Sequence, residues 1–163
     1  MADAPKLLIV GEGPVADALT EIVSVLGWPT SVTSTAPAIG PDVDAIVVTS
    51  HHEDVDGPTI RAALAAGTAY VGAMGSRRTQ ARRREWLQAN GVTQDALAAL
   101  HAPIRLDIGA DRPGEIAVSI LAEIIGTRSG RLGGASAAVT SIGVRDGAIH
   151  PELAPGESNC PGG

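Results

Sequence analysis

The residues with the clearest chemical potential form a short turn between an apolar run and an arginine-rich segment. The run 70–74 is followed directly by Gly75, Ser76, Arg77 and Arg78. Ser76 is a good helix cap, and a helix N-terminus presents unpaired N–H groups and a positive dipole end. The two arginines add forked donors that suit phosphate or carboxylate. The sequence therefore predicts that an anionic ligand binds at this turn.

A second candidate turn follows the apolar run 7–10 and has the spacing of a dinucleotide-binding fingerprint. Its first glycine permits a tight turn, and its second lets the backbone approach a pyrophosphate. The small Ala16 in third place lets helix and strand pack closely. The expected ligand contacts are Gly11, Gly13, Pro14 and Val15. The same pattern also fits a glycine-rich turn that binds nothing.

The sequence specifies a nucleotide poorly. A dinucleotide-binding domain normally ends its second strand with an acidic residue that holds the ribose 2′-hydroxyl. Ser34 and Thr35 stand at that place, and no nearby arginine would hold a 2′-phosphate. NAD(P) is therefore a cofactor to be tested, and the missing acid also fits a Rossmann domain that has been put to another use.

Polar residues follow two further apolar segments. Ser50 and His51 come directly after the run 45–49, and His51 is expected to contact the ligand or transfer a proton. The histidines and carboxylates of 51–56 lack the spacing of metal ligands, so we expect a solvated acidic loop and no metal site. Asp107 could accept a hydrogen bond from a ribose or a pterin, or cap its own turn.

Alternating strands and helices predict the fold. Strands are expected at 7–10, 31–34, 45–49 and 69–74, with a last strand or an extended loop at 104–108. Helices are expected at 15–26, 58–66, 76–89, 96–100 and 113–125, with Arg82 to Arg84 on a solvated face. This order predicts an α/β fold, a Rossmann-like, doubly wound and mostly parallel sheet flanked by helices. Residues 1–130 form that domain, and 131–163 are expected to be a Gly/Ser/Pro-rich, partly mobile tail with one weak strand at 139–144.

Composition narrows the function classes. The 163 residues carry a formal net charge of −6, which argues against nucleic-acid binding. Cys160 is the only cysteine, so no disulfide framework is expected, and no apolar run approaches the length of a membrane span. We expect a cytoplasmic protein that forms a homodimer, the commonest symmetric assembly.

Several ordered motifs resemble the XdhC/CoxI family of molybdenum hydroxylase accessory proteins. They are the stretch 70–79 (YVGAMGSRRT), the segments 101–104 (HAPI), 106–110 (LDIGA) and 115–124 (EIAVSILAEI), the turn 11–16 (GEGPVA), and the pair Ser50-His51. The resemblance covers about residues 6–130 and implies the C-terminal Rossmann domain of that family. It also implies binding of the molybdenum cofactor (molybdopterin) and its delivery to the apoenzyme of a xanthine dehydrogenase or carbon monoxide dehydrogenase type hydroxylase.

The resemblance leaves other functions open. The N-terminal domain usual in the family is expected to be absent, so a separate protein that supplies it is an expected second partner. No catalytic residue is predicted, and whether the chain is an enzyme stays open. The alternatives are a small NAD(P)-dependent oxidoreductase and a degenerate Rossmann module that only docks a partner.

Overall fold

Short strands, three of them uninterrupted apolar runs, pair in a parallel sheet. The computed structural model describes residues 3–132. Its strand order is β2-β1-β3-β4-β5, and every neighbouring pair is parallel. The strands are β1 (Leu7–Val10), β2 (Thr30–Thr33), β3 (Ala45–Val48), β4 (Tyr70–Ala73) and β5 (Leu100–His101). The predicted Rossmann-like α/β class is confirmed.

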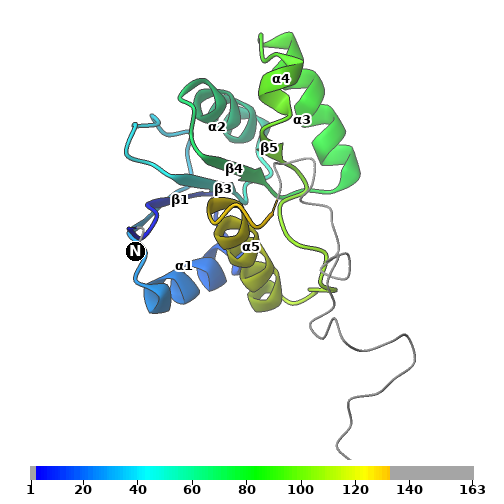
Figure 1. Cartoon of the computed structure of the whole chain (residues 1–163). Coiled ribbons are helices and arrows are strands. Elements are labelled where there is room, and N and C mark those ends of the chain that lie inside the picture. The colour runs from blue at the N-terminus through cyan, green and yellow to red at the C-terminus, as the bar shows by residue number, and fades with distance from the viewer. Residues whose placement is uncertain (1–2, 133–163) are drawn as a thin grey trace, which may run out of the picture.

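Helices cover both faces of this sheet (Figure 1). They are α1 (Pro14–Leu26), α2 (Glu53–Ala65), α3 (Arg77–Ala89), α4 (Gln94–Leu97) and α5 (Pro113–Arg128). One apolar cluster joins alternate strand residues such as Ile9 and Val47 to α1 and α5. The other joins Val10 and Val48 to α2, α3 and α4. Burial on both faces explains why β1, β3 and β4 are uninterrupted apolar runs.

The chain changes face between β1 and β3, which lie side by side. The helix after β1 packs on one face of the sheet, and the helix after β3 packs on the other. In open α/β sheets, ligands bind outside the carboxyl ends of the strands at such a switch point. The fold therefore brings the turns after β1, β3 and β4 to a single edge.

Three predicted boundaries change in the structure. The α2 helix begins at Glu53, so the predicted helix start at 58 is wrong, and the acidic loop predicted over 51–56 is wrong from Glu53 onward. Acidic side chains in the first turn favour the helix dipole, and burial of Val55 and Gly57 fixes that turn against its neighbours. The short helix lies at Gln94–Leu97, and the last strand is Leu100–His101, which leaves 104–108 as the extended-loop alternative.

The end of α1 and the C-terminal tail were both predicted from the sequence. Gly27 ends α1 in the left-handed conformation, which agrees with the predicted end of this helix at 26. The predicted tail and its weak strand at 139–144 lie outside the described residues. Within the described part, no helix is long and apolar enough to cross a membrane.

Gly57 of α2 lies directly against the Trp86 ring of α3. A Cβ atom there would lie 2.5 Å from Cε3 of the Trp86 ring, far inside van der Waals contact. Gly114, in the first turn of α5, has open space where its Cβ would stand. A neighbouring side chain therefore fills the space beside Gly57, whereas the space beside Gly114 is open.

We expect Gly57→Ala and Gly114→Ala to change stability in opposite directions. Alanine at 57 should cost about 1–3 kcal/mol, because the rigid indole cannot yield. Alanine at 114 should gain up to about 1 kcal/mol from the higher helix propensity of alanine. Urea denaturation of both variants measures this, and equal effects would show that the α2–α3 contact tolerates a methyl group.

Candidate functional site

The turn after β1 has the geometry that its glycines predict. Gly11 has a φ of +131°, and a Cβ there would lie 2.4 Å from the backbone nitrogen of Ser50. Only glycine allows this close approach between the turns after β1 and β3. Gly13 has a φ of +105° and open space where its Cβ would stand, so the backbone there is free for a ligand to approach. Ala16 is buried and lets α1 pack on the sheet.

A pocket of about 300 Å³ lies at the same edge of the sheet. Its walls come from the loop after β3, the turn after β4, the loop after β5 and the first turn of α5. The lining residues are His51, Met74, Gly75, Ser76, Pro103, Ile104, Arg105 and Ile116. Three residues predicted from the sequence, His51, Gly75 and Ser76, therefore come together on one cavity. The pocket combines an apolar surface with a helix N-terminus.

The remaining predicted residues do not line this pocket. Gly11, Gly13, Pro14 and Val15 form the turn into α1, and Ser50 is buried and accepts a hydrogen bond from the His52 backbone N–H. Arg77 and Arg78 are exposed on the first turn of α3, and Asp107 is exposed in the loop before α5. The structure thus separates the candidates into a pocket group, a glycine-turn group and an exposed group.

The start of α3 is held by two side chains. The Ser76 hydroxyl accepts a hydrogen bond from the Thr79 backbone N–H at 3.2 Å, which confirms Ser76 as the cap. The Gln80 amide donates to the Ala73 carbonyl at 3.0 Å and to that of Gly75 at 3.4 Å. These bonds fix the turn that faces the pocket.

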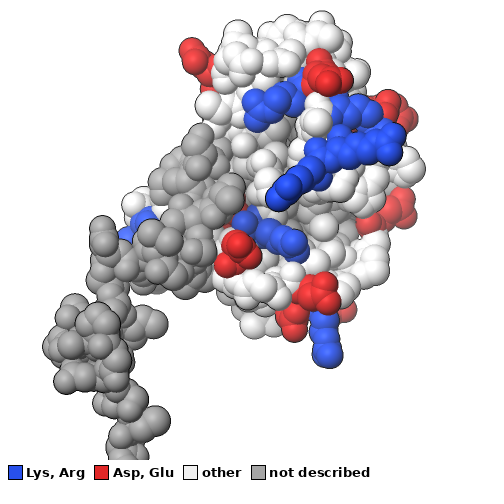
Figure 2. Space-filling view, turned by 90° about the vertical axis from the view of Figure 1, so that its right-hand side faces the viewer, with Lys and Arg blue, Asp and Glu red and all other residues white. Residues whose placement is uncertain are grey.

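The charge on α3 is unfavourable for the helix alone. Its first turn holds Arg77 and Arg78 and no acidic residue. Cations at a helix N-terminus oppose the dipole, and like charges one turn apart, such as Arg78 and Arg82, repel. Figure 2 shows Lys and Arg side chains gathered on the face of the molecule that α3 occupies. An anion bound beside this turn would relieve the repulsion.

Arg83 behaves differently from its neighbours on α3. The Arg83 guanidinium donates to the Asp56 carboxylate at 2.7 Å, to the Met74 carbonyl at 2.9 Å and to the Gln80 side chain at 2.9 Å. Arg83 is 5% exposed and Asp56 is 4% exposed, so the predicted solvated face is wrong for Arg83. The cause is helical periodicity, because position 83 points toward α2 and the sheet while 77 and 84 point outward.

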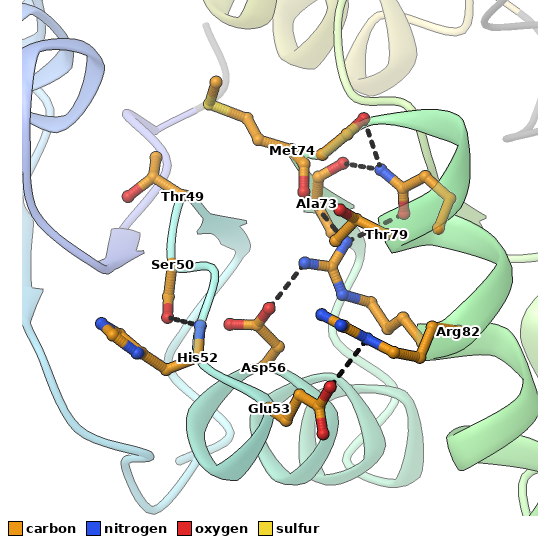
Figure 3. Close-up of polar contacts among 12 residues, drawn as sticks. Thr49, Ser50, His52, Glu53, Asp56, Ala73, Met74, Thr79 and Arg82 are labelled. Atoms are coloured by element: carbon orange, nitrogen blue, oxygen red, sulfur yellow. Dashed lines mark hydrogen bonds and ion pairs between the residues drawn. The ribbon is translucent and has the colours of Figure 1, made fainter.

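Figure 3 shows the α2 side of this contact. Asp56 points from α2 toward α3, and Glu53 reaches Arg82 in an ion pair of 2.8 Å. The Glu53–Arg82 pair is solvent-exposed and contributes little. The buried Arg83–Asp56 pair is the one that ties α2, α3 and the end of β4 together.

Sequence reasoning missed a second buried carboxylate, on the other face of the sheet. Glu123 is fully buried, and it accepts hydrogen bonds from the Tyr70 hydroxyl at 3.0 Å and the Arg105 backbone N–H at 2.8 Å. His101 Nδ1 lies 2.6 Å from Glu123 Oε1, and the His101 ring stacks on Tyr70. Burial, then the Glu123 charge and hydrogen bond, raise the pKa of Tyr70 well above 10.0. The helical spacing could have revealed this burial. Glu123 lies seven residues after Ile116, so both residues are on the apolar face of α5.

Comparison with protein families identifies the domain. A family model described as the XdhC Rossmann domain matches residues 7–124. The chain belongs to the XdhC Rossmann-domain family. The match spans β1 to α5 and therefore every residue of the pocket.

Individual relatives agree with this assignment. PaoD of Escherichia coli, a molybdenum cofactor insertion chaperone, is 28% identical over 127 residues that cover 76% of this chain and 40% of PaoD. A Bacillus subtilis protein named as a probable xanthine dehydrogenase subunit is 30% identical over 149 residues, which cover 76% of this chain and 43% of that protein. A crystal structure of a xanthine dehydrogenase from Bacillus halodurans has a TM-score of 0.64 at 26% identity, covering 80% of this chain and 46% of that one. The chain spans less than half the length of each.

Removing one partner of the buried pair should destabilise the fold strongly. We expect Arg83→Met to lower the free energy of unfolding by about 3–5 kcal/mol, because the Asp56 charge stays buried without its partner. The double variant Asp56→Asn with Arg83→Met should lose less than the sum of the single variants. Arg84→Met, on the exposed face of the same helix, should stay within about 0.5 kcal/mol of wild type. A loss as small for Arg83→Met as for Arg84→Met in urea denaturation would contradict the tie between α2 and α3.

The first turn of α5 gives a pH-dependent prediction. The Glu115 carboxylate accepts hydrogen bonds from the backbone N–H groups of Arg112 and Asp111, and these bonds hold its pKa below the ordinary value of 4.5. A lowered pKa in the folded state gives stability that is present above 4.5 and is lost as the pH falls through the folded value. The free energy of unfolding of Glu115→Gln should therefore fall less steeply with acid than that of wild type. Equal slopes would show that the cap does not form in solution.

Proposed function

We propose that this domain binds the molybdenum cofactor at the carboxyl ends of β3 and β4 and passes it to the apoenzyme of a molybdenum hydroxylase in the cytoplasm. The observation that carries the proposal is the pocket of an XdhC-family domain that joins His51, Gly75 and Ser76 to an apolar wall. The names of PaoD and of the Bacillus subtilis relative support this accessory role.

The donor set fits an anionic pterin. The phosphate of molybdopterin would lie at the N-terminus of α3, where Ser76 fixes the turn and Arg77 and Arg78 supply charge. Met74, Ile104 and Ile116 offer an apolar surface for a flat ring. Bound there, the cofactor would bring the molybdenum that the hydroxylase needs, while this chain's residues hold and orient it.

The glycine turn and the exposed residues complete the proposal. The free backbone at Gly13 and the adjoining Pro14 and Val15 would take a further anionic group of a dinucleotide form of the cofactor. Gly11 and Ser50 set the spacing between this turn and the end of β3. Asp107 lies in the loop that precedes α5, and from there its carboxylate would contact the ligand.

Partners of the domain are part of the proposal. The relatives named above are more than twice as long as the part that this chain covers, so in them other segments accompany the Rossmann domain. We propose that a further domain, of the kind that accompanies the Rossmann domain in these relatives, cooperates with this one in cofactor transfer, and that the chain forms a homodimer. Light scattering of the purified chain tests the homodimer, and light scattering with a hydroxylase apoenzyme tests association with that partner.

Calorimetry against isolated molybdenum cofactor tests the binding function. Wild type should bind, and Arg77→Ala should bind about 10-fold to 100-fold more weakly, because it loses a charge-assisted contact. Gly13→Val should weaken binding by blocking the turn. Arg84→Ala, on the same helix but outside the first turn, should stay within a factor of about two.

Other outcomes would favour a different function. Binding of NAD(H) or NADP(H) alone, with hydride transfer to a substrate, would support the small oxidoreductase, for which the geometry of the Gly11–Gly13 turn is the observation in favour. Failure to bind any of these ligands, together with stable association with a hydroxylase, would leave a docking module.

A further inference from the structure

Arg105 has a backbone conformation that a side chain normally avoids. Its φ is +128°, and among the described residues every other positive φ belongs to glycine. A bulky residue in this region is strained and persists only where the surrounding structure enforces it. The surroundings of Arg105 are therefore informative.

The backbone at Arg105 and at the residue before it is held by hydrogen bonds. The Arg105 N–H donates to the Glu123 carboxylate, which is fully buried and also accepts the Tyr70 hydroxyl. The preceding residue, Ile104, donates its N–H to the Ala73 carbonyl at 3.1 Å. The Ile104 side chain occupies the space above Gly72, where a Cβ would lie 2.4 Å from its Cδ1. The loop is thus fixed to β4 and α5 directly at Arg105.

Arg105 is one of the residues that line the pocket described above. Arg105 lines the same cavity of about 300 Å³ as His51, Gly75 and Ser76. Its guanidinium Nη1 donates to the Ala110 carbonyl at 3.2 Å, which holds the side chain along its own loop. A guanidinium has five donors, so this one bond leaves others for a ligand.

We propose that Arg105 is a binding residue for a phosphate or pyrophosphate group in this pocket, and that Glu123 is a positioning residue that acts through the Arg105 backbone. The inference rests on the proposed function and adds to it a second anion contact, on a different loop from Arg77 and Arg78. The strained backbone is the consequence of placing an arginine where the loop geometry suits glycine.

Replacing Arg105 separates strain from binding. Arg105→Gly removes both the guanidinium and the strain, whereas Arg105→Ala removes the guanidinium and keeps the strained backbone. Both variants should bind isolated molybdenum cofactor at least about 10-fold more weakly than wild type, since each loses a charged hydrogen bond. The Tm of Arg105→Gly should be equal to or higher than that of wild type, and that of Arg105→Ala should not rise. Arg84→Ala serves as the matched exposed control.

A titration of the full chain with pyrophosphate distinguishes failure of this inference from failure of the proposed function. The NMR signals to follow are the Arg105 Nε–Hε group and the Gly75 and Ser76 amides, and all three should shift together. Shifts at Gly75 and Ser76 with Arg105 unchanged, or unchanged cofactor affinity in Arg105→Gly, would overturn the role of Arg105 alone. No shift at any of the three and no cofactor binding by wild type would overturn both.

A double-mutant cycle tests the positioning role of Glu123. Glu123→Gln should lower cofactor affinity in the wild-type background and have no further effect in the Arg105→Gly background, because its influence passes through Arg105. Additive losses would show that Glu123 affects binding by another route. Glu123→Asp keeps the carboxylate and should therefore retain more of the wild-type affinity than Glu123→Gln. A loss as large as that of Glu123→Gln in the wild-type background would count against the positioning role.

Discussion

The buried ion pair between Arg83 and Asp56 is the contact on which the shape of the pocket edge depends. It crosses from α3 to α2, and the same guanidinium also holds the carbonyl of Met74, the residue after β4. Two buried charges are expensive to desolvate, so the pair adds little net stability, although removing one partner alone is costly. The geometry that it fixes is the turn 74–76, which leads into the helix N-terminus that faces the pocket.

A second buried carboxylate acts in the same way on the opposite face of the sheet. Glu123, on α5, binds the backbone of Arg105 and the hydroxyl of Tyr70. The two carboxylates thus hold two walls of one cavity, the turn after β4 through Arg83 and the loop after β5 through the Arg105 N–H. Asp56 belongs to α2 and Glu123 to α5, and these two helices pack on opposite faces of the sheet (Figure 1).

The binding site proposed above combines firmly held walls with surface charge that is unfavourable for the fold alone. The first turn of α3 holds arginines that oppose its own dipole, and Arg105 holds a strained backbone. Neither feature helps the domain to fold. Both place positive charge where the sheet edge and the pocket can present it to an anion.

The sequence alone determined the parts of this protein that depend on local pattern. Apolar runs and helical spacing predict the parallel sheet, Gly11 and Gly13 predict the tight turn after β1, and Ser76 predicts the start of α3. These follow because strand burial, positive φ and helix capping are decided by residues within a few positions of one another. The resemblance seen in the sequence covers about residues 6–130, and the family model matches nearly the same residues, 7–124.

Only the tertiary structure decided which charged residues are buried and what they hold. Arg83 meets Asp56 across 27 positions, Tyr70 meets Glu123 across 53, and Arg105 meets Glu123 across 18. Pro58 lies inside α2 because packing of the first turn outweighs the preference of proline for a helix start. Local sequence cannot reveal such pairs, because a charged residue on a helix is solvated or buried according to which distant partner the fold brings to it.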